Sequence, residues 1–173
     1  MSPDEIEEII TDLPLQLPND IRSLYRWKNG IRIGEENWEY SHIFLNWGFY
    51  PLQIIVDGYL ENVKSCYFGL GLNPANAWPI FFHAEGTRTG YALVDDKTQE
   101  TSPVVFQNCY GGGCSLIIEY ASLTSMMLTV AECYESAYFV DSNGYLHLDD
   151  NQALDIWRKF NSEKIKSEPK SFL

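Results

Sequence analysis

The chain has 173 residues, with 12 basic and 24 acidic side chains that give a formal net charge of −12 at neutral pH. A hydrophobic content of 45% is too high for a disordered chain, and this length suits one domain with a core of its own. The acidic charge argues against nucleic-acid binding, and no apolar run reaches the roughly 20 residues of a membrane helix.

The N-terminal part of the sequence predicts two helices followed by a loop. Ser-Pro-Asp-Glu at residues 2–5 combines a serine cap, an early proline and a glutamate three positions on, which predicts a helix that ends at Pro14. Residues 17–30 predict a second helix, with Gly30 as the left-handed residue that closes it. The polar and aromatic residues 35–40 predict a loop.

The middle of the sequence predicts strands around one amphipathic helix. Residues 42–47 predict a first strand, and the apolar spacing of residues 52–63 predicts a helix. Short turn-forming segments then separate strand-like runs, whose spacing predicts an antiparallel meander. These runs are residues 78–83, 90–94, 104–107 and 116–120.

The C-terminal part predicts two more helices. One spans residues 123–137, and a turn at 141–144 separates it from a last helix over 153–160. Residues 161–173 are rich in Ser, Lys and Glu, so we expect a single domain over 1–160 and a flexible tail. The order predicts an α+β fold, a central antiparallel β-meander sheet flanked by N-terminal and C-terminal helices.

Several short motifs resemble the SMI1/KNR4 family of the SUKH superfamily. Residues 17–30, Leu-Pro-Asn-Asp-Ile-Arg-Ser-Leu-Tyr-Arg-Trp-Lys-Asn-Gly, are similar to the opening of that family. The hairpin at 84–89 departs from the family pattern because it reads Ala-Glu-Gly-Thr-Arg-Thr, and the stretch after Val140 has no counterpart. The other matches follow in the family's order, over roughly residues 5–137, at 51–56, 78–80, 86–90, 91–95, 104–105 and 121–123.

The resemblance implies a non-enzymatic protein-binding module in the cytoplasm. Bacterial members are often immunity proteins that neutralise a cognate toxin by binding it, and fungal members act as regulatory scaffolds, which is the alternative here. Residues 1–150 carry 7 basic and 21 acidic side chains, a charge that would attract a basic, nuclease-type toxin domain. We expect stoichiometric occlusion of the toxin by a monomer or weak dimer.

The predicted loop at 35–40 is the best candidate for the partner-binding surface. It interleaves three glutamates with Trp38 and Tyr40, and exposed aromatic side chains are good interface anchors. The alternative is that both aromatic rings are buried while the acids face water. The residues predicted to bind the partner are Glu35, Glu36, Trp38, Glu39, Asp95 and Asp96.

Neither a metal site nor a cofactor site is predicted. Cys109 and Cys114 flank a triglycine, whereas Cys66, Cys133 and the three histidines are scattered singly. The triglycine is not followed by the Lys-Ser/Thr of a phosphate-binding loop. With no secretory leader, we expect the four cysteines to stay reduced in the cytosol.

An enzyme acting on a small molecule is the rival hypothesis. His83, Glu85 and the Asp95-Asp96 pair would then serve as acid and base groups. Adjacent aspartates in polar segments usually form turns or cap helices, and nothing in the sequence selects one pair over another. The sequence therefore predicts no catalytic residues.

Overall fold

The computed structural model describes residues 1–30, 42–44, 47–64, 77–83, 88–93, 102–110, 113–161 and 165. It mixes helices with antiparallel sheets, as expected for an α+β protein. The helices are α1 (Pro3–Ile10), α2 (Asn19–Trp27), α3 (Leu52–Lys64), α4 (Leu123–Glu132), the π-helix η3 (Cys133–Ala137) and α5 (Asp150–Asn161). The strands are β1 (His42–Phe44), β2 (Trp47–Phe49), β3 (Ala77–His83), β4 (Arg88–Leu93), β5 (Val104–Tyr110), β6 (Gly113–Tyr120), β7 (Tyr138–Val140) and β8 (Leu146–Leu148).

Six of these strands form one sheet in the order β1-β2-β3-β4-β5-β6, with antiparallel neighbours throughout. The helix α3 lies in the connection from β2 to β3. Phe44 pairs with Trp47 and His42 with Gly48 in an antiparallel arrangement. The single strand predicted over residues 42–47 is therefore wrong, because two short strands occupy this part of the chain.

Serine side chains begin two of the helices. Ser2 Oγ accepts a hydrogen bond from Glu5 N at 3.2 Å, and Glu5 Oε2 accepts one from Ser2 N at 2.6 Å. This capping box confirms the start predicted for α1. At α4, Ser122 and Ser125 cap each other in the same reciprocal way, at 3.0 and 2.9 Å. Each box satisfies two amides that a helix N-terminus leaves unpaired.

Gly30 does adopt the left-handed conformation, with φ of +70°, but it does not close α2. The helix ends at Trp27, and its C-cap residue is the extended Lys28. A Cβ atom on Gly30 would lie 2.2 Å from the backbone nitrogen of Pro51. The glycine is needed because two segments distant in the sequence come into backbone contact there.

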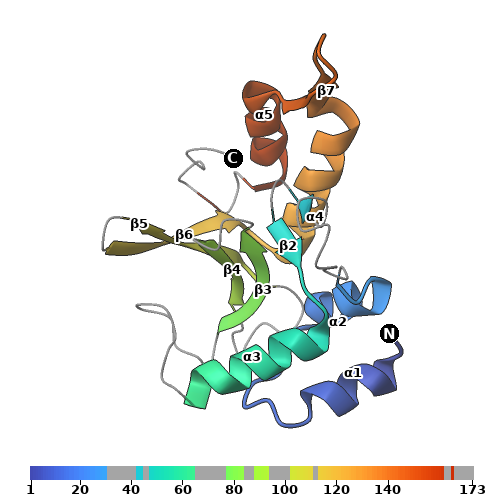
Figure 1. The fold of residues 1–173 in the computed structure, drawn as a ribbon, viewed down its shortest axis with the longest axis vertical. Coiled ribbons are helices and arrows are strands. Elements are labelled where there is room, and N and C mark those ends of the chain that lie inside the picture. Colours follow the sequence, from blue (N-terminus) through green and yellow to red (C-terminus); the bar gives the residue numbers. More distant parts are fainter. Residues whose placement is uncertain are drawn as a thin grey trace.

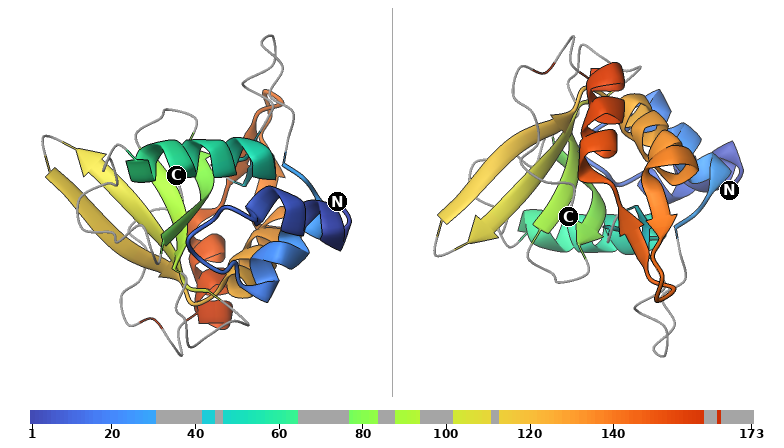
Figure 2. Two further views of the ribbon diagram at one scale, coloured as in Figure 1. Left: turned by 90° about the horizontal axis from the view of Figure 1, so that it is seen from below. Right: turned by 90° about the horizontal axis from the view of Figure 1, so that it is seen from above.

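The main core lies between the sheet and the helices. Figure 1 shows the sheet curved beside α3 and α4, and Figure 2 shows β5 and β6 extending away from the helices. Aromatic rings from helices and strands meet in this core, Tyr25 with Phe49 at 5.0 Å and Tyr59 with Trp78 at 5.3 Å between centroids. Ile165, beyond α5, also packs against this core.

The last helix is tied to the end of the edge strand β6. Trp157 Nε1 donates a hydrogen bond to the carbonyl oxygen of Glu119 at 2.7 Å. Asn161, which is buried, accepts one from Ala121 N at 3.0 Å and donates one to Thr129 Oγ1 at 3.2 Å. These bonds hold α5 against the junction of β6 and α4. Among the described residues, no helix has the length and apolar character to cross a membrane.

Candidate functional site

The six partner-binding residues predicted from the sequence lie outside the described residues. Glu35, Glu36, Trp38 and Glu39 fall in the segment 31–41, and Asp95 and Asp96 fall in 94–101. Glu85, which the enzyme hypothesis invoked, also lies outside. These assignments therefore remain predictions.

Burial favours the neutral forms of the titratable side chains in the described core. Nowhere in the described ranges do three His, Cys, Asp or Glu side chains gather in a way that could hold a metal ion. Burial raises the pKa of the Cys133 thiol to about 11 and that of the Tyr59 hydroxyl to about 12. Both groups are therefore protonated at neutral pH.

A two-stranded hairpin, β7–β8, projects from one end of the molecule (Figure 1). The chain is helical through Ala137, as the sequence predicts, but residues 133–137 form a π-helix. The backbone N–H of Tyr138 donates to the carbonyl of Cys133, five residues earlier, and the chain then becomes extended. Such π-helical turns are rare and frequently occur at functional sites.

The tip of the hairpin is held by one aspartate. Asp141 Oδ1 accepts hydrogen bonds from Asn143 N at 2.8 Å and Tyr145 N at 2.9 Å. Its Oδ2 lies 3.0 Å from His147 Nε2, and Gly144, with φ of +87°, completes the turn. The backbone bond from Tyr145 and then the His147 contact hold the pKa of Asp141 below its usual value.

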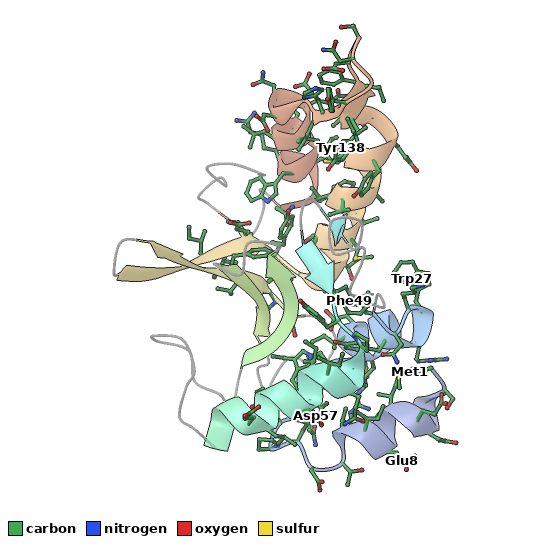
Figure 3. The ribbon with its side chains drawn as sticks, viewed as in Figure 1. Met1, Glu8, Trp27, Phe49, Asp57 and Tyr138 are labelled. Atoms are coloured by element: carbon green, nitrogen blue, oxygen red, sulfur yellow. The ribbon has the colours of Figure 1, made fainter. Side chains whose placement is uncertain are left out.

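The base of the hairpin rests on a small core of its own. Tyr138 and Leu148 pack against a cluster of buried side chains from η3 and α5. The ring of Tyr138 stacks on that of Tyr134 at 4.8 Å, and Figure 3 shows Tyr138 beside α5. An isolated two-stranded hairpin is marginally stable in water, so this packing is what fixes its position. The cluster consists of Cys133, Ala137, Ala153 and Ile156.

The outer part of the hairpin exposes large apolar side chains, which we call the hairpin surface. Their exposed fractions are 52% for Phe139, 63% for Val140, 69% for Tyr145 and 60% for Leu146. Phe139 pairs with His147 and Val140 with Leu146, and alternate residues of a strand point to opposite faces. Apolar side chains therefore project from both faces of the hairpin.

The segment that carries the hairpin surface is acidic. Residues 130–161 carry six acidic and two basic side chains, which leaves a net charge of −4. Lys159 bonds Glu132 at 2.6 Å and Arg158 bonds Asp155 at 2.8 Å, so both basic groups are paired with acids. The acids are Glu132, Glu135, Asp141, Asp149, Asp150 and Asp155.

Sequence reasoning missed this hairpin, although a signal for it was present. The turn residues 141–144 stand between the apolar runs 138–140 and 145–148, an arrangement typical of a hairpin. Exposed apolar clusters rimmed by polar groups mark protein contact sites more than they mark catalytic ones. The geometry therefore suits binding to another macromolecule.

Comparison with known families identifies a match for most of the chain. The sequence fits the SMI1/KNR4 family (SUKH-1) over residues 1–129, from α1 to near the end of α4. The resemblance drawn from residues 17–30 is thereby confirmed. No curated protein matches the chain. The family match ends before the hairpin begins.

Proposed function

Since the chain belongs to the SMI1/KNR4 family (SUKH-1), we propose that it is an immunity protein that neutralises a cognate toxin by binding it. The toxin is a basic protein domain, with a nuclease as the preferred class. Neutralisation is stoichiometric and needs no catalysis, because the bound chain blocks access to the toxin's active site. The observation that carries the proposal is the family match over 1–129.

The charge of the chain supports a basic partner. A net charge of −12 produces a long-range field that speeds association with a cationic domain. A nuclease binds a phosphate backbone through basic side chains, and an acidic protein competes for the same groups. The same charge disfavours nucleic acid itself as the partner.

The predicted loop remains the proposed first contact in the family-matched part of the chain. Glu35, Glu36 and Glu39 would steer the encounter, and Trp38 would anchor the complex. Asp95 and Asp96 would extend this acidic surface. The sequence density of acids beside aromatic side chains supports this assignment.

The test is co-expression with the toxin domain encoded by the neighbouring gene, since immunity genes lie beside their toxins. We expect cells to survive only when this chain is also produced, and the purified proteins to form a 1:1 complex by light scattering after gel filtration. A toxin of the same class from an unrelated locus serves as the control and should remain lethal. Equal killing with and without the chain would contradict the immunity function.

A further inference from the structure

We propose that the β7–β8 hairpin is a wedge that inserts into an apolar groove of the toxin domain, between basic side chains of that partner. This inference rests on the proposed function and adds the surface and the mode of contact. The contact residues are Phe139, Val140, Tyr145 and Leu146, which define the hairpin surface.

The two faces of the hairpin decide the shape of the partner's site. Val140 and Leu146 are paired on one face, while Phe139 projects from the other, where its ring stacks on His147 at 5.5 Å. A flat surface could cover only one of these faces. A groove covers both, and it removes the most apolar area from water for a strand pair of this size.

The hairpin is built to keep its shape before binding. Asp141 holds the tip through two backbone hydrogen bonds, and Tyr138 and Leu148 fix the base against the small cluster. An element that is ordered before it binds loses less conformational entropy in the complex. Aromatic side chains on such an element are the usual anchors of protein interfaces.

The charges around the hairpin select the chemistry of the partner. Glu135 and Asp150 are exposed at its base, and the two nearby basic residues are already paired with acids. If the partner were a second copy of this chain, two segments 130–161 would face each other, each with a net charge of −4, and they would repel. A basic protein instead gains complementary contacts at the rim of the groove.

The hairpin also lies where recognition can be particular to this chain. The family match ends at residue 129, and the hairpin spans 138–148, at the end of the molecule opposite α1 (Figure 1). A toxin that contacts the hairpin can therefore be recognised specifically by this chain. Toxins that contact only the part matched by the family would not gain this interaction.

The test compares a hairpin variant with a matched control against the neighbouring toxin domain. The variant Phe139→Ser/Leu146→Ser removes one apolar side chain from each face, and Ile54→Ser removes an equally exposed one from α3. We expect the double variant to bind about tenfold more weakly or worse, and the control to bind within about twofold of the unsubstituted chain. Each single hairpin variant should also weaken binding, because both faces are contacted.

A second measurement needs no substitution in the hairpin. Hydrogen exchange on the unsubstituted chain should show the amides of 138–148 protected in the complex relative to the free chain. Tight toxin binding by the double variant, together with unchanged exchange at 138–148, would overturn the wedge and leave the immunity function standing. Dimers of the free chain that the double variant dissociates would assign the hairpin to self-association instead. Failure of the unsubstituted chain to bind the toxin would contradict the proposed function itself.

Discussion

The side-chain oxygen of Asn29 accepts a hydrogen bond from the backbone N–H of Leu52 at 2.9 Å. Asn29 lies just after α2, and Leu52 is the first residue of α3, so the asparagine satisfies one of the unpaired amides at the start of a different helix. The neighbouring Gly30 lies against Pro51 in the same contact. The Asn-Gly pair thus joins α2 to α3 rather than ending α2.

Gly30→Ala should be far more destabilising than Gly144→Ala. Both glycines have positive φ, which costs a side-chain residue about 1–3 kcal/mol, but only Gly30 faces backbone atoms that a Cβ would overlap. Nothing lies within 4 Å of a Cβ built on Gly144. Urea unfolding of both variants measures the difference. Equal losses would show that backbone conformation, and not the contact with Pro51, sets the cost.

Replacing Asn161 by alanine should lower the free energy of unfolding by about 2–3 kcal/mol. The substitution leaves the part-buried Ala121 N–H without its acceptor and the buried Thr129 Oγ1 without its donor. The control is Asn151→Ala, at an exposed position near the start of the same helix, which should change stability by less than about 0.5 kcal/mol. A similar loss for both variants in thermal unfolding would place the effect in helix propensity instead.

The hairpin tip should loosen in acid. The pKa of Asp141 is lowered from 3.8 by the backbone bond from Tyr145 and then by His147, so its contribution to stability is fully present above 3.8 and is lost as pH falls through the lowered value. The protection of amides 141–145 against exchange, relative to their intrinsic rate at each pH, should therefore fall in that range, before that of α3. In Asp141→Asn this pH-dependent loss of protection should disappear, and its persistence there would assign the effect to another group.

Converting Glu35, Glu36 and Glu39 to lysine should slow association with the toxin domain and leave folding nearly unchanged. The effect should shrink with added salt, because charges more than roughly 10 Å apart are screened at about 0.1 M. A control that converts Glu8, Asp12 and Asp57 to lysine has the same net charge but alters exposed acids on and near α1 and on α3. Stopped-flow kinetics that do not distinguish the two variants would remove the loop from the interface.

Trp38→Ala tests the same loop through a different rate. An apolar anchor acts after docking, so its removal should speed dissociation and leave the association rate close to that of the unsubstituted chain. Surface plasmon resonance separates the two rates. An unchanged dissociation rate would support the alternative that the Trp38 ring is buried in the fold.

Sequence patterns correctly predicted those parts of the fold that depend on interactions between residues close in the sequence. The capping box at Ser2 and the apolar spacing of α3 each involve residues within a few positions, and the structure has both. The role of Gly30 was mistaken because its conformation serves a contact with Pro51, 21 residues away. Contacts of that kind leave no periodic trace in a single sequence.

The candidate site was less predictable for a related reason. A sequence pattern predicts burial for apolar residues such as Val140 and Leu146, although both are exposed in the structure. No local feature of the sequence shows where the supporting core ends. In the structure the small cluster ends at Tyr138 and Leu148, so the next residues on the same face project beyond it. The π-helical turn at 133–137 also continued the helical pattern up to the point where the strand begins.

The hydrogen bond between the Trp157 indole and the Glu119 carbonyl has a consequence for synthesis on the ribosome. Each strand of the large sheet pairs with its predecessor, so the sheet can assemble in the order in which the chain emerges. The edge strand β6 ends at Tyr120, and Trp157, whose indole bonds Glu119, is synthesised 37 residues later. During that interval the end of β6 is uncovered, and unpaired strand edges are the sites where nascent chains aggregate. A nonsense codon ahead of Trp157 would make this exposure permanent, and the truncated product would be a substrate for chaperones and proteases rather than a shorter functional protein.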